Sequence, residues 1–152
     1  MLKLFNRVFL FFLINALIRS QVLINEVLAS NLQYMEDEFG DYDDIIELYN
    51  PTNVAVNLSG YFLSDDPEYL TKWIFPEYEE LSVLQPGAYR VLWADNEPHQ
   101  GLNHLPFSLD KSGESVVLTE PDAVTIVDQI DYQNQQRDIS YGRSRNSQHV
   151  WL

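Results

Sequence analysis

Residues 45–66 read IIELYNPTNVAVNLSGYFLSDD, and this stretch indicates the fold. Apolar and polar residues alternate on both sides of two turn sequences, Asn50-Pro51 and Ser59-Gly60. Alternation with a period of two predicts strands that bury one face, and Asn-Pro and Ser-Gly pairs favour turns. The stretch therefore predicts three short strands, with Ile46 and Leu48 on the buried face of the first strand.

The rest of the chain repeats this pattern, with turn sequences roughly every 8–12 residues, as is typical of a β-sandwich or barrel. Within the first further strand, alternation places Ile24 and Val27 on opposite faces. A short apolar segment at 72–75 offers Trp73 as a core residue. We expect about nine short strands and no helix after the N-terminal segment. The six further strands are expected at 22–31, 88–94, 104–109, 114–119, 124–132 and 139–143.

The N-terminus has the three parts of a secretory signal peptide. Lys3 and Arg7 precede an apolar run at 8–18, and the small residue Ser20 follows that run. A membrane-spanning helix needs about 20 apolar residues, so this run is too short to span a bilayer. We predict a signal peptide at 1–20 and a single domain at 21–152, with no stable membrane span after cleavage. An uncleaved N-terminal anchor is the alternative.

The composition limits the compartment and the partners. The chain has 152 residues, no cysteine and a formal net charge of −14. Removal of residues 1–20 takes away three basic side chains and no acidic one, which makes the formal charge −17. Such a chain repels phosphate backbones, so we expect no nucleic-acid partner. A secreted domain without disulfides is also more typical of bacteria than of a eukaryotic exterior.

Two acidic stretches flank the three predicted strands, and they are the candidate metal site. Calcium binds six to eight oxygen ligands, and closely spaced aspartates supply several of them. We therefore consider calcium as a ligand, although the spacing does not match an EF-hand loop. A solvated acidic loop without an ion is the alternative. The candidate calcium ligands are Asp41, Asp43, Asp44, Asp65 and Asp66.

No motif for catalysis is present. His99, His104 and His149 do not have the spacing of a zinc-binding HExxH motif, and we expect His99 to be solvated. The chain lacks a GxSxG elbow and a cysteine nucleophile. Glu26 and Glu47 face each other if their strands pair, but ion pairs with Arg90 or Arg143, or hydrogen bonds to amides, explain them better than acid–base catalysis. We expect no enzymatic activity within this chain.

Several ordered motifs resemble the bacterial form of the lamin tail domain over residues 23–143. The resemblance implies an immunoglobulin-like β-sandwich without catalytic machinery, in agreement with the predicted strands. The motifs are INEVLASN, DYDDIIELYNPTNVAVNLSGYFLSDD, KWIFP, YRVLWAD, LPFSLDKSGESVVLTEPD and ISYGR.

The resemblance also implies a function. We expect a secreted or cell-surface module for adhesion, surface attachment or protein–protein interaction, with a protein or cell-surface partner. The alternative is the N-terminal accessory domain of a larger secreted enzyme, such as one with a spore-coat-type kinase domain. The family usually continues past a tryptophan such as Trp151 into a last strand, so we expect either a fragment or a shortened last strand. The nucleotide sequence downstream of Leu152 distinguishes these alternatives.

Overall fold

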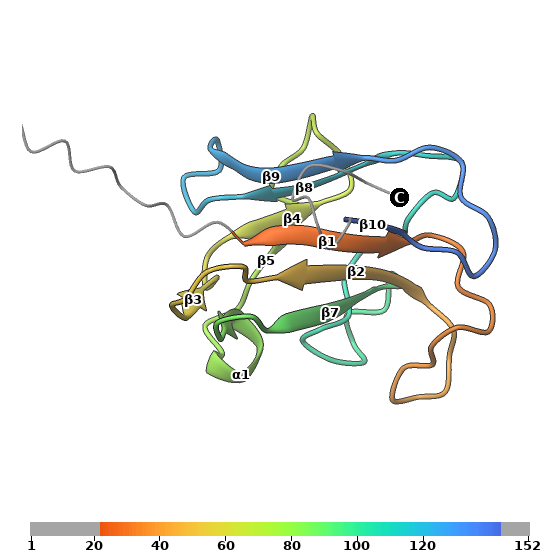
Figure 1. Cartoon of the computed structure of the whole chain (residues 1–152), viewed down its shortest axis with the longest axis horizontal. Helices are drawn as coiled ribbons and strands as arrows, with labels where there is room; N and C mark the ends of the chain where they lie inside the picture. Colours follow the sequence, from red (N-terminus) through yellow and green to blue (C-terminus); the bar gives the residue numbers. More distant parts are fainter. Residues whose placement is uncertain (1–21, 144–152) are drawn as a thin grey trace, which may run out of the picture.

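The computed structural model describes residues 22–143, which form two four-stranded antiparallel sheets (Figure 1). The first sheet has the order β10-β1-β2-β7, and the second has the order β5-β4-β8-β9. The first sheet consists of β1 (Leu23–Leu28), β2 (Asp44–Tyr49), β7 (Tyr89–Ala94) and β10 (Tyr141–Gly142). The second consists of β4 (Phe62–Ser64), β5 (Trp73–Ile74), β8 (Ser115–Thr119) and β9 (Ile126–Asp131). A small additional pair joins β3 (Val56–Asn57) to β6 (Val83–Leu84).

One apolar core lies between the two sheets. Ile46 and Leu48 of β2 are fully buried in it, as the alternation predicted. The second sheet contributes Leu63 from β4 and Leu118 from β8. A second, smaller cluster of Leu28, Ile45 and Trp93 lies on the opposite face of the first sheet, with Met35 of the preceding loop packed against it. The first sheet is thus covered on both faces at one end.

A β-bulge in β1 corrects the prediction that Ile24 and Val27 point to opposite faces. The pairing with β2 shifts between Ile24 and Glu26, so that Asn25 is an extra residue in the strand. One extra residue reverses the alternation that follows it. Ile24 and Val27 are therefore both fully buried in the main core.

At segment 104–109, where Pro106 favours an edge or irregular strand, the chain forms isolated bridges rather than a strand. Leu105, Phe107 and Leu109 are buried in the main core, as their alternation indicated. Pro106 has no N–H group, and proline interrupts a ladder of backbone hydrogen bonds. The segment follows the edge of β7 through isolated bridges, one of them between Trp93 and His104.

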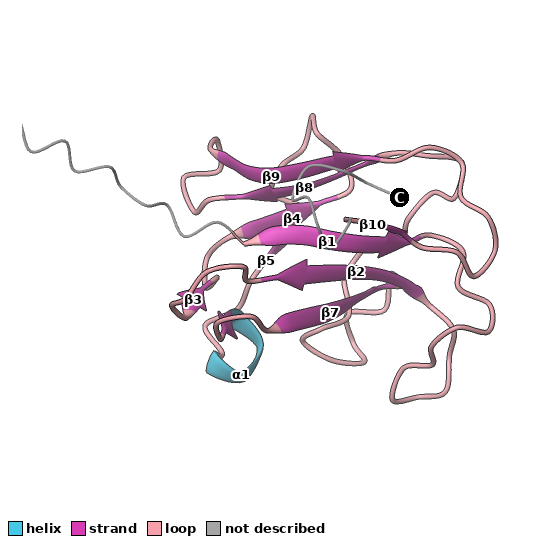
Figure 2. Cartoon of the chain, viewed as in Figure 1, coloured by secondary structure: helices cyan, strands magenta, loops and turns pink. Residues whose placement is uncertain are grey.

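Between Phe75 and Tyr89 the chain forms a single helical turn and then a tight turn. A single helical turn, α1 (Glu79–Ser82), corrects the prediction that the domain has no helix; it is the one helix in Figure 2. Its end is fixed by the Ser82 hydroxyl, which donates to the Pro76 carbonyl at 2.6 Å. In the following Pro86-Gly87 turn, Gly87 has φ +71°, the left-handed conformation that a type II turn requires at this position.

The immunoglobulin-like all-β sandwich that we predicted is confirmed. Residues 22–143 contain ten strands rather than nine, because β5 and β6 were not expected as strands and the expected strand at 104–109 is absent. A helix long and apolar enough to cross a membrane is not found in this part of the chain. The predicted signal peptide at 1–20, His149 and Trp151 lie outside the described residues.

Candidate functional site

The outer face of the first sheet carries paired tyrosines beside paired glutamates. Tyr49 lies opposite Tyr89, and their rings stack with centroids 4.5 Å apart and an interplanar angle of 22°. Glu47, two residues before Tyr49 on β2, lies opposite Glu26 of β1. Tyr89 is 54% exposed. We name these four residues the Tyr–Glu face.

The two glutamates repel each other. Burial and, to a smaller extent, the Glu26 charge raise the pKa of Glu47, while the Asn25 amide, which donates to Glu47 Oε1 at 2.7 Å, opposes the rise. The predicted ion pairs with Arg90 or Arg143 are not formed among the described residues; Arg143 pairs with Asp128 at 2.6 Å. The Tyr–Glu face therefore offers two carboxylates and an aromatic pair to a cationic group.

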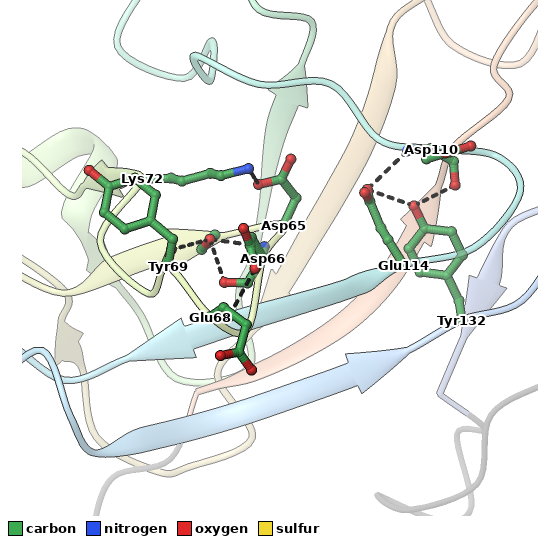
Figure 3. Close-up of polar contacts among 9 residues, drawn as sticks. Asp65, Asp66, Glu68, Tyr69, Lys72, Asp110, Glu114 and Tyr132 are labelled. Carbon is green, nitrogen blue, oxygen red and sulfur yellow. Dashed lines mark hydrogen bonds and ion pairs between the residues drawn. The ribbon is translucent and has the colours of Figure 1, made fainter.

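Asp65 and Asp66 have structural partners in the turn after β4 (Figure 3). Asp65 forms an ion pair with Lys72, and its side chain is 10% exposed. Asp66 Oδ1 accepts a hydrogen bond from the Glu68 backbone at 2.9 Å, and its own N–H donates to Ser64 Oγ at 3.0 Å. These contacts shape the turn.

Asp41 and Asp43 lie at the end of the loop before β2, and Asp44 is the first residue of that strand. Burial is the main cause that raises the pKa of both Asp43 and Asp44 to about 6. Asp44 Oδ2 accepts a hydrogen bond from the Leu109 N–H at 3.3 Å. The Asp41 carbonyl accepts a hydrogen bond from the Asp37 N–H, and the Asp41 N–H donates to Asp37 Oδ1. The backbone of this loop end is thus fixed, while Asp43 Oδ2 is buried without a hydrogen-bond partner.

The structure does not assemble the five aspartates into one ligand set. In the part of the chain that it describes, the group of ligand atoms within 4.8 Å of one another comes from Asp37, Glu38 and His104 instead. Burial is the main cause that raises the pKa of Glu114, and the Asp65 charge raises it further. Calcium binding by the five aspartates stays a prediction.

Glu114 belongs to a separate polar cluster around the buried Tyr132, on the right of Figure 3. The Tyr132 hydroxyl donates to Glu114 Oε1 at 2.9 Å and also contacts the Asp110 carbonyl at 3.0 Å. Burial and the Glu114 charge raise the pKa of the Tyr132 hydroxyl, which stays protonated. The cluster closes the turn before β8 onto the end of β9, so its role is structural.

Sequence reasoning missed a second cluster, around His104. The side chains of His104 and Asp95 are completely buried and bonded to each other through His104 Nδ1. His104 Nε2 faces Glu38 Oε1 at 3.4 Å. Asp37 and Glu38 lie in the acidic loop, more than 60 positions before His104, so no local spacing motif relates them. His99 is exposed, as predicted.

The sequence was compared with known proteins and protein families to identify the family of this chain. No curated protein matches the chain. Among protein families, the Lamin Tail Domain matches residues 18–134, which is most of the chain. That match agrees with the two-sheet sandwich and with the motifs that carry the resemblance. The chain therefore belongs to the lamin tail domain family, whose members are non-catalytic, immunoglobulin-like domains used in protein interaction.

Proposed function

We propose that this chain is a secreted, non-catalytic module that attaches to a protein or cell-surface partner through the Tyr–Glu face. The observation that carries the proposal is the stacked Tyr49–Tyr89 pair beside the paired carboxylates Glu47 and Glu26. The same attachment role suits the N-terminal accessory domain of a larger secreted enzyme.

The chemistry of this face selects a basic partner. Tyrosine is enriched in protein interfaces, and its ring attracts lysine and arginine cations. In the described part of the chain neither Glu26 nor Glu47 forms an ion pair, so a basic side chain brought by a partner relieves their repulsion. The formal net charge of −14 adds long-range attraction to a basic surface.

Secretion is the second part of the proposal, and it rests on the basic, apolar and small-residue parts of segment 1–20. The full-length chain with a C-terminal tag is expressed in the source cells, which are separated into medium, envelope and cytoplasm. We expect the tag in the medium or on the envelope, on a chain shortened by about 20 residues. Full-length protein confined to the cytoplasm contradicts secretion.

Attachment is tested with labelled mature protein on intact source cells. The double substitution Tyr49→Ala, Tyr89→Ala is expected to lower cell binding at least fivefold, because it removes the aromatic pair. Binding is also expected to fall as sodium chloride is raised to 0.5 M, since salt screens attraction between exposed charges.

The matched control is Tyr69→Ala, which removes an equally exposed tyrosine from the turn after β4. Thermal melts establish that each variant is folded. Loss of binding with the double substitution and full binding with the control support the proposal. Equal binding by the folded double variant and the natural chain overturns it.

A further inference from the structure

Three potential metal ligands from two distant segments meet beside the edge strand β7. Asp37 and Glu38 lie in the acidic loop between β1 and β2, and His104 lies in the segment that follows the edge of β7. One ligand atom of each residue lies within 4.8 Å of the other two. We name them the Asp37–Glu38–His104 trio.

The His104 ring is held in the orientation of a metal ligand. It is 1% exposed, and Asp95 contacts its Nδ1 atom. A metal-binding histidine commonly donates its other ring N–H to a carboxylate in this way. When Nδ1 carries the proton, Nε2 is a lone-pair acceptor, and Nε2 is buried without a hydrogen-bond partner. Its nearest acidic neighbour, Glu38 Oε1 at 3.4 Å, is also an acceptor. A metal ion between these two atoms resolves the contact, as does a proton on Nε2.

Asp37 supplies a second buried atom without a partner. Its side chain is fixed through Oδ1, which accepts hydrogen bonds from the N–H groups of Phe39 and Asp41 at 2.8 Å each. Asp37 is only 9% exposed, and its Oδ2 atom is buried without a hydrogen-bond partner. An unpaired buried carboxylate oxygen is costly, and metal coordination is one way to compensate that cost.

Gly101 leaves room where the two segments meet, and a Cβ at this position would lie 3.0 Å from Asn103 Oδ1. A side chain at Gly101 would place its Cβ 3.2 Å from the His104 ring and 3.8 Å from Glu38 Oε1. The Phe39 ring packs edge-on against His104 from the loop side, with centroids 5.9 Å apart. The local packing therefore brings the acidic loop and the His104 ring together.

We propose that the Asp37–Glu38–His104 trio binds a divalent ion of the zinc class, with Asp95 as the positioning residue for His104. One imidazole nitrogen and two carboxylates suit zinc and related transition metals, whereas calcium prefers a larger set of oxygen ligands. Zinc forms bonds of about 2.0–2.2 Å, so the ligands must move closer together on binding. Glu38 can make this movement, because its side chain is 51% exposed. The ion ties the acidic loop to the segment beside β7.

The experiment measures zinc binding to the metal-free mature chain by titration calorimetry, with thermal melts in parallel. We expect one zinc ion per chain and a higher melting temperature, because an ion that binds only the folded state stabilises it. Calcium at the same concentration is expected not to compete with zinc for the trio, so the zinc affinity should stay unchanged when calcium is added. Cobalt(II) bound in place of zinc is expected to show visible absorption bands, which report that the His104 nitrogen is one of its ligands.

Two substitutions localise the ion. Glu38→Gln removes a partly exposed ligand with little risk to folding and is expected to weaken zinc binding at least tenfold. Asp95→Asn is expected to weaken it about 10–100-fold while one ion per chain still binds, which is the effect of changing an outer-shell partner. His104→Gln should abolish the one-to-one site, and its thermal melt in the absence of metal establishes whether it folds.

The matched controls are His99→Gln, which removes an exposed histidine from the preceding loop, and Asp41→Asn, which removes an exposed carboxylate next to the trio. Both variants are expected to bind zinc within threefold of the natural chain. Absence of stoichiometric zinc binding overturns the proposal. Equal zinc binding by Glu38→Gln and the natural chain also overturns it, because the ion is then held elsewhere.

Discussion

At the scale of the residue, Asn25 decides how β1 meets the core. As the extra residue of the bulge, it lets Ile24 and Val27 reach the same core. Its side-chain amide donates to Glu47, and its carbonyl accepts a hydrogen bond from the Arg143 N–H at 2.8 Å. One asparagine therefore sets the strand register, supports a repelled carboxylate and anchors β10.

Glu47 gives a prediction at this scale. Its pKa is raised in the folded state, so the folded state pays no penalty at acidic pH, where both states carry the proton. The destabilisation begins as pH rises through the pKa of Glu47 in the unfolded chain, and it is complete above the raised pKa of the folded chain. Glu47→Gln is therefore expected to raise the free energy of unfolding at pH 7.5 by roughly 0.2–1 kcal/mol, because it removes a half-buried charge that also lies opposite Glu26.

Urea unfolding followed by tryptophan fluorescence at pH 7.5 and pH 3.5 measures this effect. The gain from Glu47→Gln should disappear at the lower pH. Glu68→Gln, which changes an exposed carboxylate, should have no effect at either pH. A gain of the same size at both pH values would show that the Glu47 charge is not its cause.

At the scale of the element, a polar clamp joins the two sheets. Asp128 of β9 accepts a hydrogen bond from the Ile24 N–H of β1 at 2.7 Å and pairs with Arg143 at 2.6 Å. The Arg143 guanidinium also donates from Nε to the Ile24 carbonyl at 2.8 Å. The side chains of Arg143 and Asp128 are only 7% and 11% exposed. The clamp therefore holds β1 and β9 together through one nearly buried ion pair.

Removal of one partner from this pair should be costly. Asp128→Ala removes the carboxylate that pairs with Arg143 and accepts the Ile24 N–H, so we expect the free energy of unfolding to fall by about 3 kcal/mol. The measurement is the urea midpoint at pH 7. Arg137→Ala breaks the more exposed pair with Asp138 and should cost less than about 1 kcal/mol. Equal losses in the two variants would refute a special role for the clamp.

At the scale of the whole molecule, partly buried carboxylates make the free energy of unfolding depend on pH. Burial is the main cause that raises the pKa of Asp44 to about 6 from 3.8 and also raises the pKa of Glu114 and Asp128. Between about pH 4 and pH 6 the folded chain keeps protons that the unfolded chain has released. The free energy of unfolding should therefore fall as pH rises through this window and stay lower above it.

We expect a higher urea midpoint at pH 5 than at pH 8, measured with a chelator so that bound metal does not contribute. At pH 8, added sodium chloride should raise the midpoint, because it screens repulsion within a chain of formal net charge −14. An equal or higher midpoint at pH 8 in low salt would contradict this account.

The sequence alone determined the fold class. Period-two alternation and turn sequences are local properties, and they located most of the strands and the buried face of β2. The ordered motifs also indicated the family, because they extend over nearly the whole domain.

Only the tertiary structure decided the sites. The bulge at Asn25, the Arg143–Asp128 clamp and the Asp37–Glu38–His104 trio each join residues that are brought together by strand pairing and loop packing. The sequence directed attention to clustered aspartates, because closeness along the chain is what a sequence shows. The folded chain instead joined part of that loop to a histidine more than 60 positions away, since ligand geometry depends on distance in space.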